Sequence, residues 1–219
     1  MAETRVGPEG HNGWDHSAMS EGARIRANTY SMLASLLSAP PQPELLGLLR
    51  SIELPPADQA DRSDNIRCGW RQIRLAAAQT SPQSLDDEYH DLFIGVGRGE
   101  VVPYGSWHLT GFLMEKPLSD LRDDLKSLGL EAGEAHKDPE DHIAALCESM
   151  ALVIRADDID EARERRFFMR HLHSWAGRFF ADLQAAKSAC FYKSVGFLGQ
   201  RFVEMESQYL NIQAHIQAH

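Results

Sequence analysis

Apolar residues recur with the period of an α-helix along almost the whole chain. After Ser20, a residue type that commonly precedes a first helical turn, Tyr30, Leu33 and Leu37 recur on one face. The same spacing returns at Leu118, Leu121, Leu125 and Leu128, before Gly129. No stretch alternates apolar and polar residues for long enough to predict a strand. The pattern therefore predicts an all-α protein with a single, bundle-like helical domain.

Polar segments divide the chain. The first residues are rich in Gly, His and Asn and have no apolar run, so they predict a disordered leader rather than a secretory signal. The polar stretch "EAGEAHKD", residues 131–138, is expected to act as a hinge between two helical halves. The expected parts are a leader (1–19), a helical domain (20–210, with halves at about 20–130 and 138–210) and a C-terminal tail (211–219).

Charge and cysteine usage exclude several classes of protein. The formal net charge of −10 argues against a nucleic-acid partner, which would need a basic surface, and suits a positively charged partner. No apolar run approaches the ~18 residues of a membrane span, so we expect no stable membrane insertion. Cys68, Cys147 and Cys190 are widely spaced and form no CxxC pair. A reduced, cytoplasmic protein without a disulfide framework is therefore expected.

The glycine-rich stretch "GVGRG", Gly95–Gly99, invites comparison with loops that bind phosphate. Such loops follow a strand and open a helix whose N–H groups meet the phosphate. Here the stretch follows a predicted helix and leads into "EVVP", where Pro103 delays the next helix. We interpret it as a flexible connector that lets two helices meet at an unusual angle. A guanine-nucleotide-binding or hydrolysing protein that uses this loop remains the alternative hypothesis.

No residue set predicts catalysis or a metal centre. A di-iron bundle needs paired Glu-x-x-His motifs and a hydrolase of the familiar kind needs a GxSxG elbow, and both are absent. His215 and His219 lie one helical turn apart, but a helix end is the better interpretation because no third ligand lies nearby in sequence. The stretch "ERRFFMR", Glu164–Arg170, resembles an export motif far from the N-terminus, and we interpret it as a helix with Phe167 and Phe168 inside. The expectation is a protein with no catalytic residues and no metal.

Three short motifs carry most of the remaining information. The first is "EYHDLFIG", in which Tyr89, Leu92 and Phe93 share one helix face. The second is "PYGSWHL", with two aromatic residues around a serine. The third is "DPEDHI", where Asp138 is expected to be a helix N-cap and Pro139 the first helical residue.

In this order the motifs resemble the TorD/DmsD family of redox-enzyme maturation chaperones. The family pattern is similar to Glu-x3-Leu-Phe-x-Gly, then Pro-aromatic-x-Ser, then Pro-Glu-Asp-His-Ile. The later "HLHSWAGRFF" and "FYKSVGFLGQRFVEME" also resemble the closing helices of the family, so the likeness extends from about Tyr30 to Glu206. The resemblance implies an all-helical, TorD-like fold and a cytoplasmic chaperone rather than an enzyme.

The resemblance also implies the partners. They would be the twin-arginine signal peptide and the apo form of the catalytic subunit of a molybdenum- or tungsten-cofactor oxidoreductase, whose export is delayed until the cofactor is inserted. It implies a monomer that also forms a dimer, by exchange of halves, and no cofactor, with weak GTP binding reported for some members.

A twin-arginine signal has a basic part followed by an apolar part, so its binder needs an apolar groove with acidic groups at one end. Leu92, Phe93, Tyr104 and Trp107 are candidates for the apolar wall. Plain core packing is the alternative role for each aromatic residue, and a helix N-cap is the alternative for Asp141. The predicted peptide-binding residues are Tyr89, Leu92, Phe93, Pro103, Tyr104, Ser106, Trp107, Glu140, Asp141 and His142.

Overall fold

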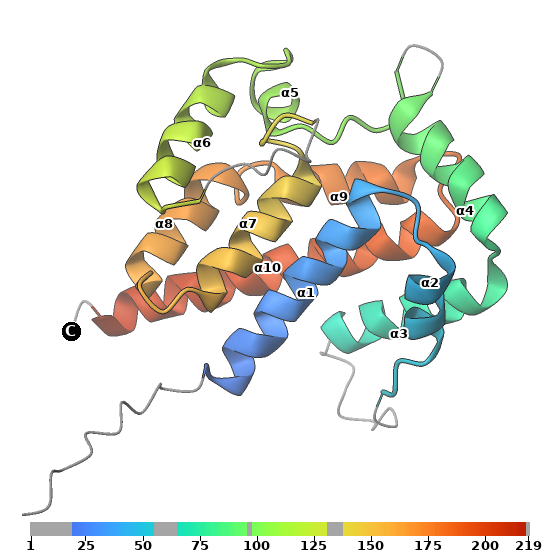
Figure 1. The fold of residues 1–219 in the computed structure, drawn as a ribbon, viewed down its shortest axis with the longest axis horizontal. Helices are drawn as coiled ribbons and strands as arrows, with labels where there is room; N and C mark the ends of the chain where they lie inside the picture. The colour runs from blue at the N-terminus through green and yellow to red at the C-terminus, as the bar shows by residue number, and fades with distance from the viewer. Residues whose placement is uncertain (1–18, 55–64, 96–97, 131–137, 218–219) are drawn as a thin grey trace, which may run out of the picture.

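The structure, a computed structural model, describes residues 19–54, 65–95, 98–130 and 138–217. Within these ranges every regular element is helical, which confirms the predicted all-α class (Figure 1). In chain order the helices are α1 (Glu21–Ser38), α2 (Pro43–Arg50), α3 (Asn65–Gln79), α4 (Pro82–Tyr89), the π-helical turn η2 (His90–Ile94), α5 (Gly105–Thr110), α6 (Lys116–Ser127), α7 (Ile143–Arg155), α8 (Glu161–His171), α9 (Ala176–Ala185) and α10 (Phe191–Gln217).

The helices of the two predicted halves pack against each other. α1 lies along α7, and α10 crosses the molecule with α3 and α9 against it (Figure 1). Thus α1 and α3 from the first half bury their apolar faces on helices of the second half. The expected hinge, residues 131–137, lies outside the described residues, as do most of the expected leader and the last two residues. The largest fully buried side chains are Trp175, Tyr30, Tyr192, Phe168, Phe179, Phe180, Phe191 and Phe202.

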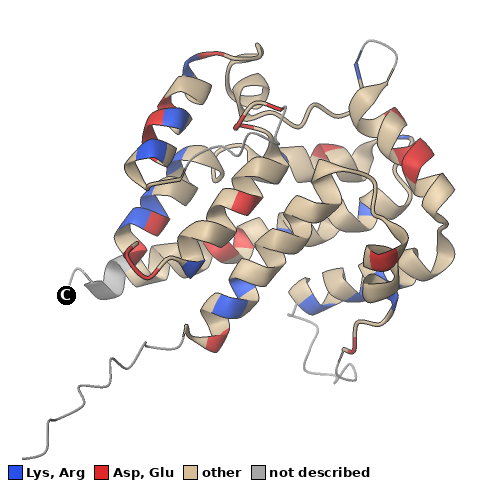
Figure 2. Ribbon diagram, viewed as in Figure 1, with Lys and Arg blue, Asp and Glu red and all other residues tan. Residues whose placement is uncertain are grey.

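Several helix ends follow the sequence as predicted. The Ser20 hydroxyl accepts a hydrogen bond from the backbone N–H of Ala23 at 3.2 Å and so caps α1. Gly129 takes a left-handed φ of 71° just after α6. Phe167 and Phe168 are buried, as expected for the "ERRFFMR" stretch in α8. Figure 2 shows both signs of charge interspersed along α6 and α8.

One predicted helix start is wrong. α7 begins at Ile143 and its N-cap is His142, not Asp138, because residues 139–142 form a turn held by another segment of the chain. As a result, Asp141 lies in a turn rather than in a helix, and its backbone and side chain contact the first residues of α5. At the other end of the chain, α10 continues to Gln217 and so overlaps the segment expected as a tail, 211–219.

The described ends of the glycine-rich loop form a closed turn rather than an open connector. Gly95 has a φ of 57° and donates its N–H to the His90 carbonyl at 2.7 Å. Gly99 is buried so tightly that a Cβ there would lie 2.4 Å from the Leu92 carbonyl oxygen. Glycine is therefore required at both positions by backbone conformation or by close approach. Val96 and Gly97, between them, lie outside the described residues.

Glu88 and Tyr89, at the end of α4, connect this helix to α1 and to α10. The buried Glu88 carboxylate accepts hydrogen bonds from the backbone N–H groups of Cys190, Phe191 and Tyr192 at 2.7, 3.1 and 2.8 Å, and so caps the N-terminus of α10. A negative charge there also complements the helix dipole. The Tyr89 hydroxyl donates to a carbonyl near the end of α1, that of Leu37, at 3.3 Å.

We predict that Glu88→Ala destabilises the protein by about 2 kcal/mol or more, because it leaves buried N–H groups of α10 without an acceptor. Asp86→Ala, an exposed acid in the same helix, is the matched control and should change stability by less than about 0.5 kcal/mol. Urea unfolding monitored by circular dichroism measures both. Equal midpoints for the two variants would show that the cap contributes nothing.

Candidate functional site

The second and third motifs meet in a short antiparallel contact. Tyr104 and His142 form an isolated β-bridge. On its two sides, Gly105 donates its N–H to the Asp141 carbonyl at 2.9 Å, and Ile143 donates to the Pro103 carbonyl at 2.8 Å. These bonds explain why α7 starts late, since the backbone groups before Ile143 are already engaged by another segment.

Asp141 is the most unusual residue of this junction. It is 3% exposed, and its Oδ2 accepts the backbone N–H of Ser106 at 2.7 Å, which caps the N-terminus of α5. The alternative role foreseen for Asp141, a helix cap, is therefore right in kind, but the capped helix is α5 and not the one that follows in sequence. Within the described chain, no group donates a hydrogen bond to the second oxygen, Oδ1, which is also buried.

His142 and Tyr104 close the junction. The His142 Nδ1 accepts the backbone N–H of Ala144 at 3.1 Å, so the ring must be unprotonated at this nitrogen. Burial lowers the pKa of His142 and favours this neutral form. Its ring meets the Tyr104 ring edge-on at 5.1 Å, and the Tyr104 hydroxyl donates to Asp138 at 3.1 Å. Burial, with Asp138 nearby, raises the pKa of Tyr104 to about 12.

A pocket of about 160 Å³ lies beside this junction, between α5, α6, the start of α7 and the end of α8. Two carboxylates, those of Asp120 and Asp141, and one guanidinium, that of Arg170, line it. Its apolar lining includes Leu109, Pro117, Leu121, Leu146 and Trp175. The pocket thus combines a partly apolar wall with an excess of negative charge.

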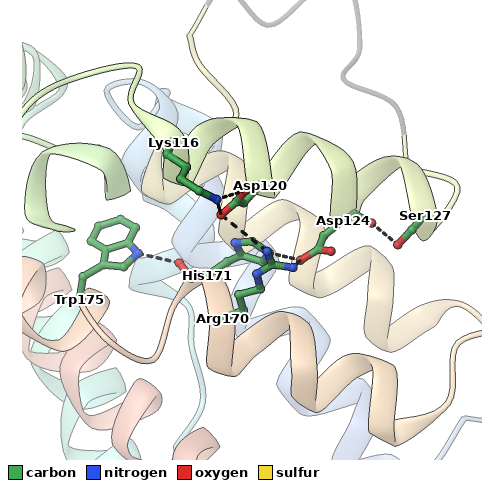
Figure 3. Close-up of polar contacts among 7 residues, drawn as sticks. All are labelled: Lys116, Asp120, Asp124, Ser127, Arg170, His171 and Trp175. Carbon is green, nitrogen blue, oxygen red and sulfur yellow. Dashed lines mark hydrogen bonds and ion pairs between the residues drawn. The ribbon is translucent and has the colours of Figure 1, made fainter. Parts of the chain in front are cut away.

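An ion-pair ladder between α6 and α8 fixes one side of the pocket (Figure 3). Asp120 pairs with Lys116 at 2.9 Å and with Arg170 at 3.6 Å. Asp124 accepts from Arg170 at 2.8 Å and lies 2.7 Å from His171 Nε2. Burial lowers the pKa of His171, and the hydrogen bond to Asp124 opposes that effect.

Trp175 completes the pocket wall from the other side. Its indole N–H donates to the His171 carbonyl at 2.6 Å (Figure 3). The ring is buried and stacks on His108 with centroids 5.2 Å apart. The indole ring of Trp175 is therefore held by a hydrogen bond to the backbone of α8 as well as by ring stacking.

The remaining predicted residues lie outside the pocket lining. Tyr89 and Leu92 are buried in the core, and the half-buried Phe93 packs on Tyr192 with ring centroids 5.4 Å apart. Trp107 is half-buried, with the Arg98 guanidinium 4.8 Å over its ring.

Glu140 is held by Arg122 through two-pronged hydrogen bonds of 2.8 to 3.0 Å, which lower the pKa of its carboxyl group. The structure thus brings together the second and third motifs, while the aromatic residues of the first motif, Tyr89 and Phe93, pack against Tyr192 of α10.

Sequence reasoning missed Asp120, Arg170, His171 and Trp175. Asp120 and Asp124 are four residues apart, and so lie on one face of α6 opposite the paired Arg170 and His171. That spacing was visible in the sequence, but the pairing of α6 with α8 was not.

The glycine-rich loop gains no support as a phosphate site. The helix that follows it, α5, has only six residues, and the carboxylate of Asp141 already occupies its N-terminus. In the part of the chain that the structure describes, no group of three or more metal-ligating side chains is found. The same residues include no helix that is long and apolar enough to cross a membrane.

Comparisons with known proteins agree on one family. The family model for the nitrate reductase delta subunit matches residues 59–181. The chaperone protein TorD of Aliivibrio fischeri is 25% identical over 202 residues, covering 84% of this chain and 94% of the relative. That of Vibrio atlanticus is 26% identical over 148 residues, covering 63% and 69%.

A solved chain described as a candidate redox enzyme maturation protein, from Archaeoglobus fulgidus, shares the fold. Its TM-score is 0.54 at 19% identity, over 82% of this chain and 94% of that chain. The family model and the TorD relatives therefore identify the class as redox-enzyme maturation chaperones of the TorD type, with an all-helical fold. The chain belongs to the nitrate reductase delta subunit family, as the match over more than half of its length shows.

We predict that His142→Asn makes stability less sensitive to acid. The pKa of His142 is lowered in the folded state, so its contribution is complete above the unfolded value of about 6.5 and is lost as the pH falls below it. Asparagine retains an acceptor for the Ala144 N–H but does not titrate. Urea unfolding between pH 5 and 7 should give a shallower pH dependence for the variant than for the parent. Parallel curves would show that His142 is not a source of the acid sensitivity.

Proposed function

We propose that the chain is a cytoplasmic chaperone that binds the twin-arginine signal peptide of a molybdenum- or tungsten-cofactor oxidoreductase. In this proposal it also contacts the apo catalytic subunit, assists cofactor insertion and delays export until the enzyme is mature. Its membership of a family of redox-enzyme maturation chaperones supports this function. The identity of the bound peptide rests on the chemistry of the pocket.

The unpaired oxygen of Asp141 carries the proposal. A buried carboxylate oxygen without a donor is costly, and a donor supplied by a ligand would remove that cost. An arginine side chain offers several N–H donors and a positive charge, which suit a carboxylate better than any neutral group does. Because Oδ1 is covered, we expect a small displacement of the pocket wall when the ligand enters.

Charge also favours a basic ligand. Of the two carboxylates that line the pocket, Asp120 is paired with Lys116 and Arg170, and Arg170 is also paired with Asp124. No ion pair to Asp141 is found among the described residues, so its charge is the unbalanced one. The chain as a whole has a formal net charge of −10. A basic peptide would therefore be attracted at long range and find an unbalanced carboxylate at short range.

The other predicted residues take supporting roles in this proposal. Tyr104 and His142 hold the turn that carries Asp141, while Ser106 and Pro103 hold α5 against it. Trp107 is proposed as a further apolar contact for the peptide.

For the first motif, Tyr89 and Leu92 are proposed to support Phe93 from the core, and Phe93 remains a proposed peptide contact. Glu140 is proposed to bind an arginine of the peptide. In that case the peptide arginine would replace Arg122, with which Glu140 is paired in the structure.

The oligomeric state is also part of the proposal. We propose a monomer that forms a dimer by exchange of helical halves. The packing of α1 on α7 supports this, because the same apolar faces would be buried if the two helices came from different copies. The connector between the halves lies outside the described residues.

We predict that Asp141→Asn weakens binding of a twin-arginine peptide by roughly tenfold at low salt, and by less at high salt. Asparagine retains an oxygen for the Ser106 N–H, so α5 remains capped while the charge is lost. Asp123→Asn removes an equal charge from an exposed position on α6 and is the matched control. Calorimetric titration at two ionic strengths measures the effect. Equal affinities for the two variants would place the peptide elsewhere.

A further inference from the structure

Leu109 in the last turn of α5 and three residues of the loop that joins α5 to α6 are large, apolar and exposed, four side chains within six residues. Leu109 is 44% exposed, Phe112 67%, Leu113 52% and Met114 72%. This loop lies at the top of the molecule in Figure 1, and its residues 111–114 include no charged side chain. Exposing so much apolar surface together is unfavourable in water, and such patches commonly mark interaction sites.

The loop is fixed in a defined conformation. Met114 has a φ of 59°, a left-handed value that is strained for a residue with a side chain, and its N–H is held by the Ser106 hydroxyl at 3.3 Å. The Thr110 hydroxyl donates to the Ser106 carbonyl at 2.8 Å. Ser106, a predicted site residue, therefore anchors the loop to α5 from within the pocket lining.

The apolar loop leaves and rejoins the rest of the chain beside the acidic pocket. Leu109 lines the pocket at the start of the loop and Pro117 lines it just after the end. The exposed side chains of Phe112, Leu113 and Met114 lie between these two positions in the chain. A ligand that places a cation beside Asp141 would therefore meet the apolar loop immediately outside the pocket.

We propose that this loop, through Leu109, Phe112, Leu113 and Met114, binds the apolar segment that follows the arginines of the signal peptide. The inference rests on the proposed function and extends it, because it assigns the two parts of the peptide to two parts of the surface. The arginine enters the pocket, and the next apolar residues cover the loop. Apolar contacts supply affinity, and the carboxylates of the pocket fix the direction of the chain.

A second copy of this chain is a poorer occupant of the loop. A second copy has a formal net charge of −10, so it does not complement the excess negative charge of the pocket beside the loop. A basic peptide with an apolar continuation complements both the charge of the pocket and the apolar character of the loop.

The test uses the double variant Phe112→Ser/Leu113→Ser, which should fold because both side chains are largely exposed. Leu48→Ser is the matched control, since Leu48 is 63% exposed on α2, a different element. Two synthetic peptides are titrated by calorimetry. One has two arginines followed by an apolar stretch of about ten residues, and the other has the same arginine part with the apolar stretch replaced by Gly and Ser.

We expect the double variant to bind the complete peptide at least about tenfold more weakly than the parent does, with little dependence on salt. It should bind the polar peptide as the parent does, and Leu48→Ser should bind both normally. If the parent binds the complete peptide and the double variant binds it equally well, the assignment of the loop is wrong while the proposed function stands.

If the parent binds neither peptide, the proposed function fails, and this inference fails with it. Light scattering, which measures the oligomeric state, tests whether a second copy of the chain occupies the loop instead. Loss of a dimer in the double variant, with peptide affinity unchanged, would identify the loop as a contact between copies and overturn the peptide assignment.

Discussion

Buried carboxylates that cap helices far away in the sequence hold this structure together. Asp141 caps α5 across a separation of 35 residues, and Glu88 caps α10 across about a hundred. An exposed carboxylate, that of Glu100, makes similar contacts to the turn before α10, where it accepts the Lys187 N–H at 2.7 Å and the Ser188 hydroxyl at 2.6 Å. Each carboxylate satisfies backbone donors that have no other acceptor, and so fixes the position of one element relative to another.

This arrangement explains why the recognisable motifs contain so many residues that hold one helix or turn against another. Glu88 and Tyr89 position α10 and the end of α1, and His142 positions the turn that carries Asp141. Asp141 and Ser106 also line the pocket, in addition to holding α5 or the loop that follows it. The motifs therefore describe mainly a scaffold, and the proposed binding surface is a small part of it.

The helical class, most helix positions and the family were predictable because they depend on local signals: apolar periodicity, capping residues and short motifs. The start of α7 was not. Asp138 followed by Pro139 is a sound local start for a helix, but the bridge between Tyr104 and His142 engages the backbone first. Two further features could not be predicted for the same reason. The ion pairs between α6 and α8 depend on which helices pack together, and the exposure of the apolar loop before α6 depends on what covers it.

The two tasks of Asp141 also link binding to the position of α5. Its Oδ2 must keep the Ser106 N–H, while any ligand cation would draw on the same carboxylate through Oδ1. Ser106 in turn holds Met114, so a shift of the carboxylate would reach the apolar loop through two hydrogen bonds. Filling the pocket would thus be coupled to the position of the loop through one short chain of contacts. In a peptide with both a cation and an apolar segment, binding of the cation at Asp141 would favour binding of the apolar segment at the loop. Such a peptide would therefore bind more tightly than either part alone.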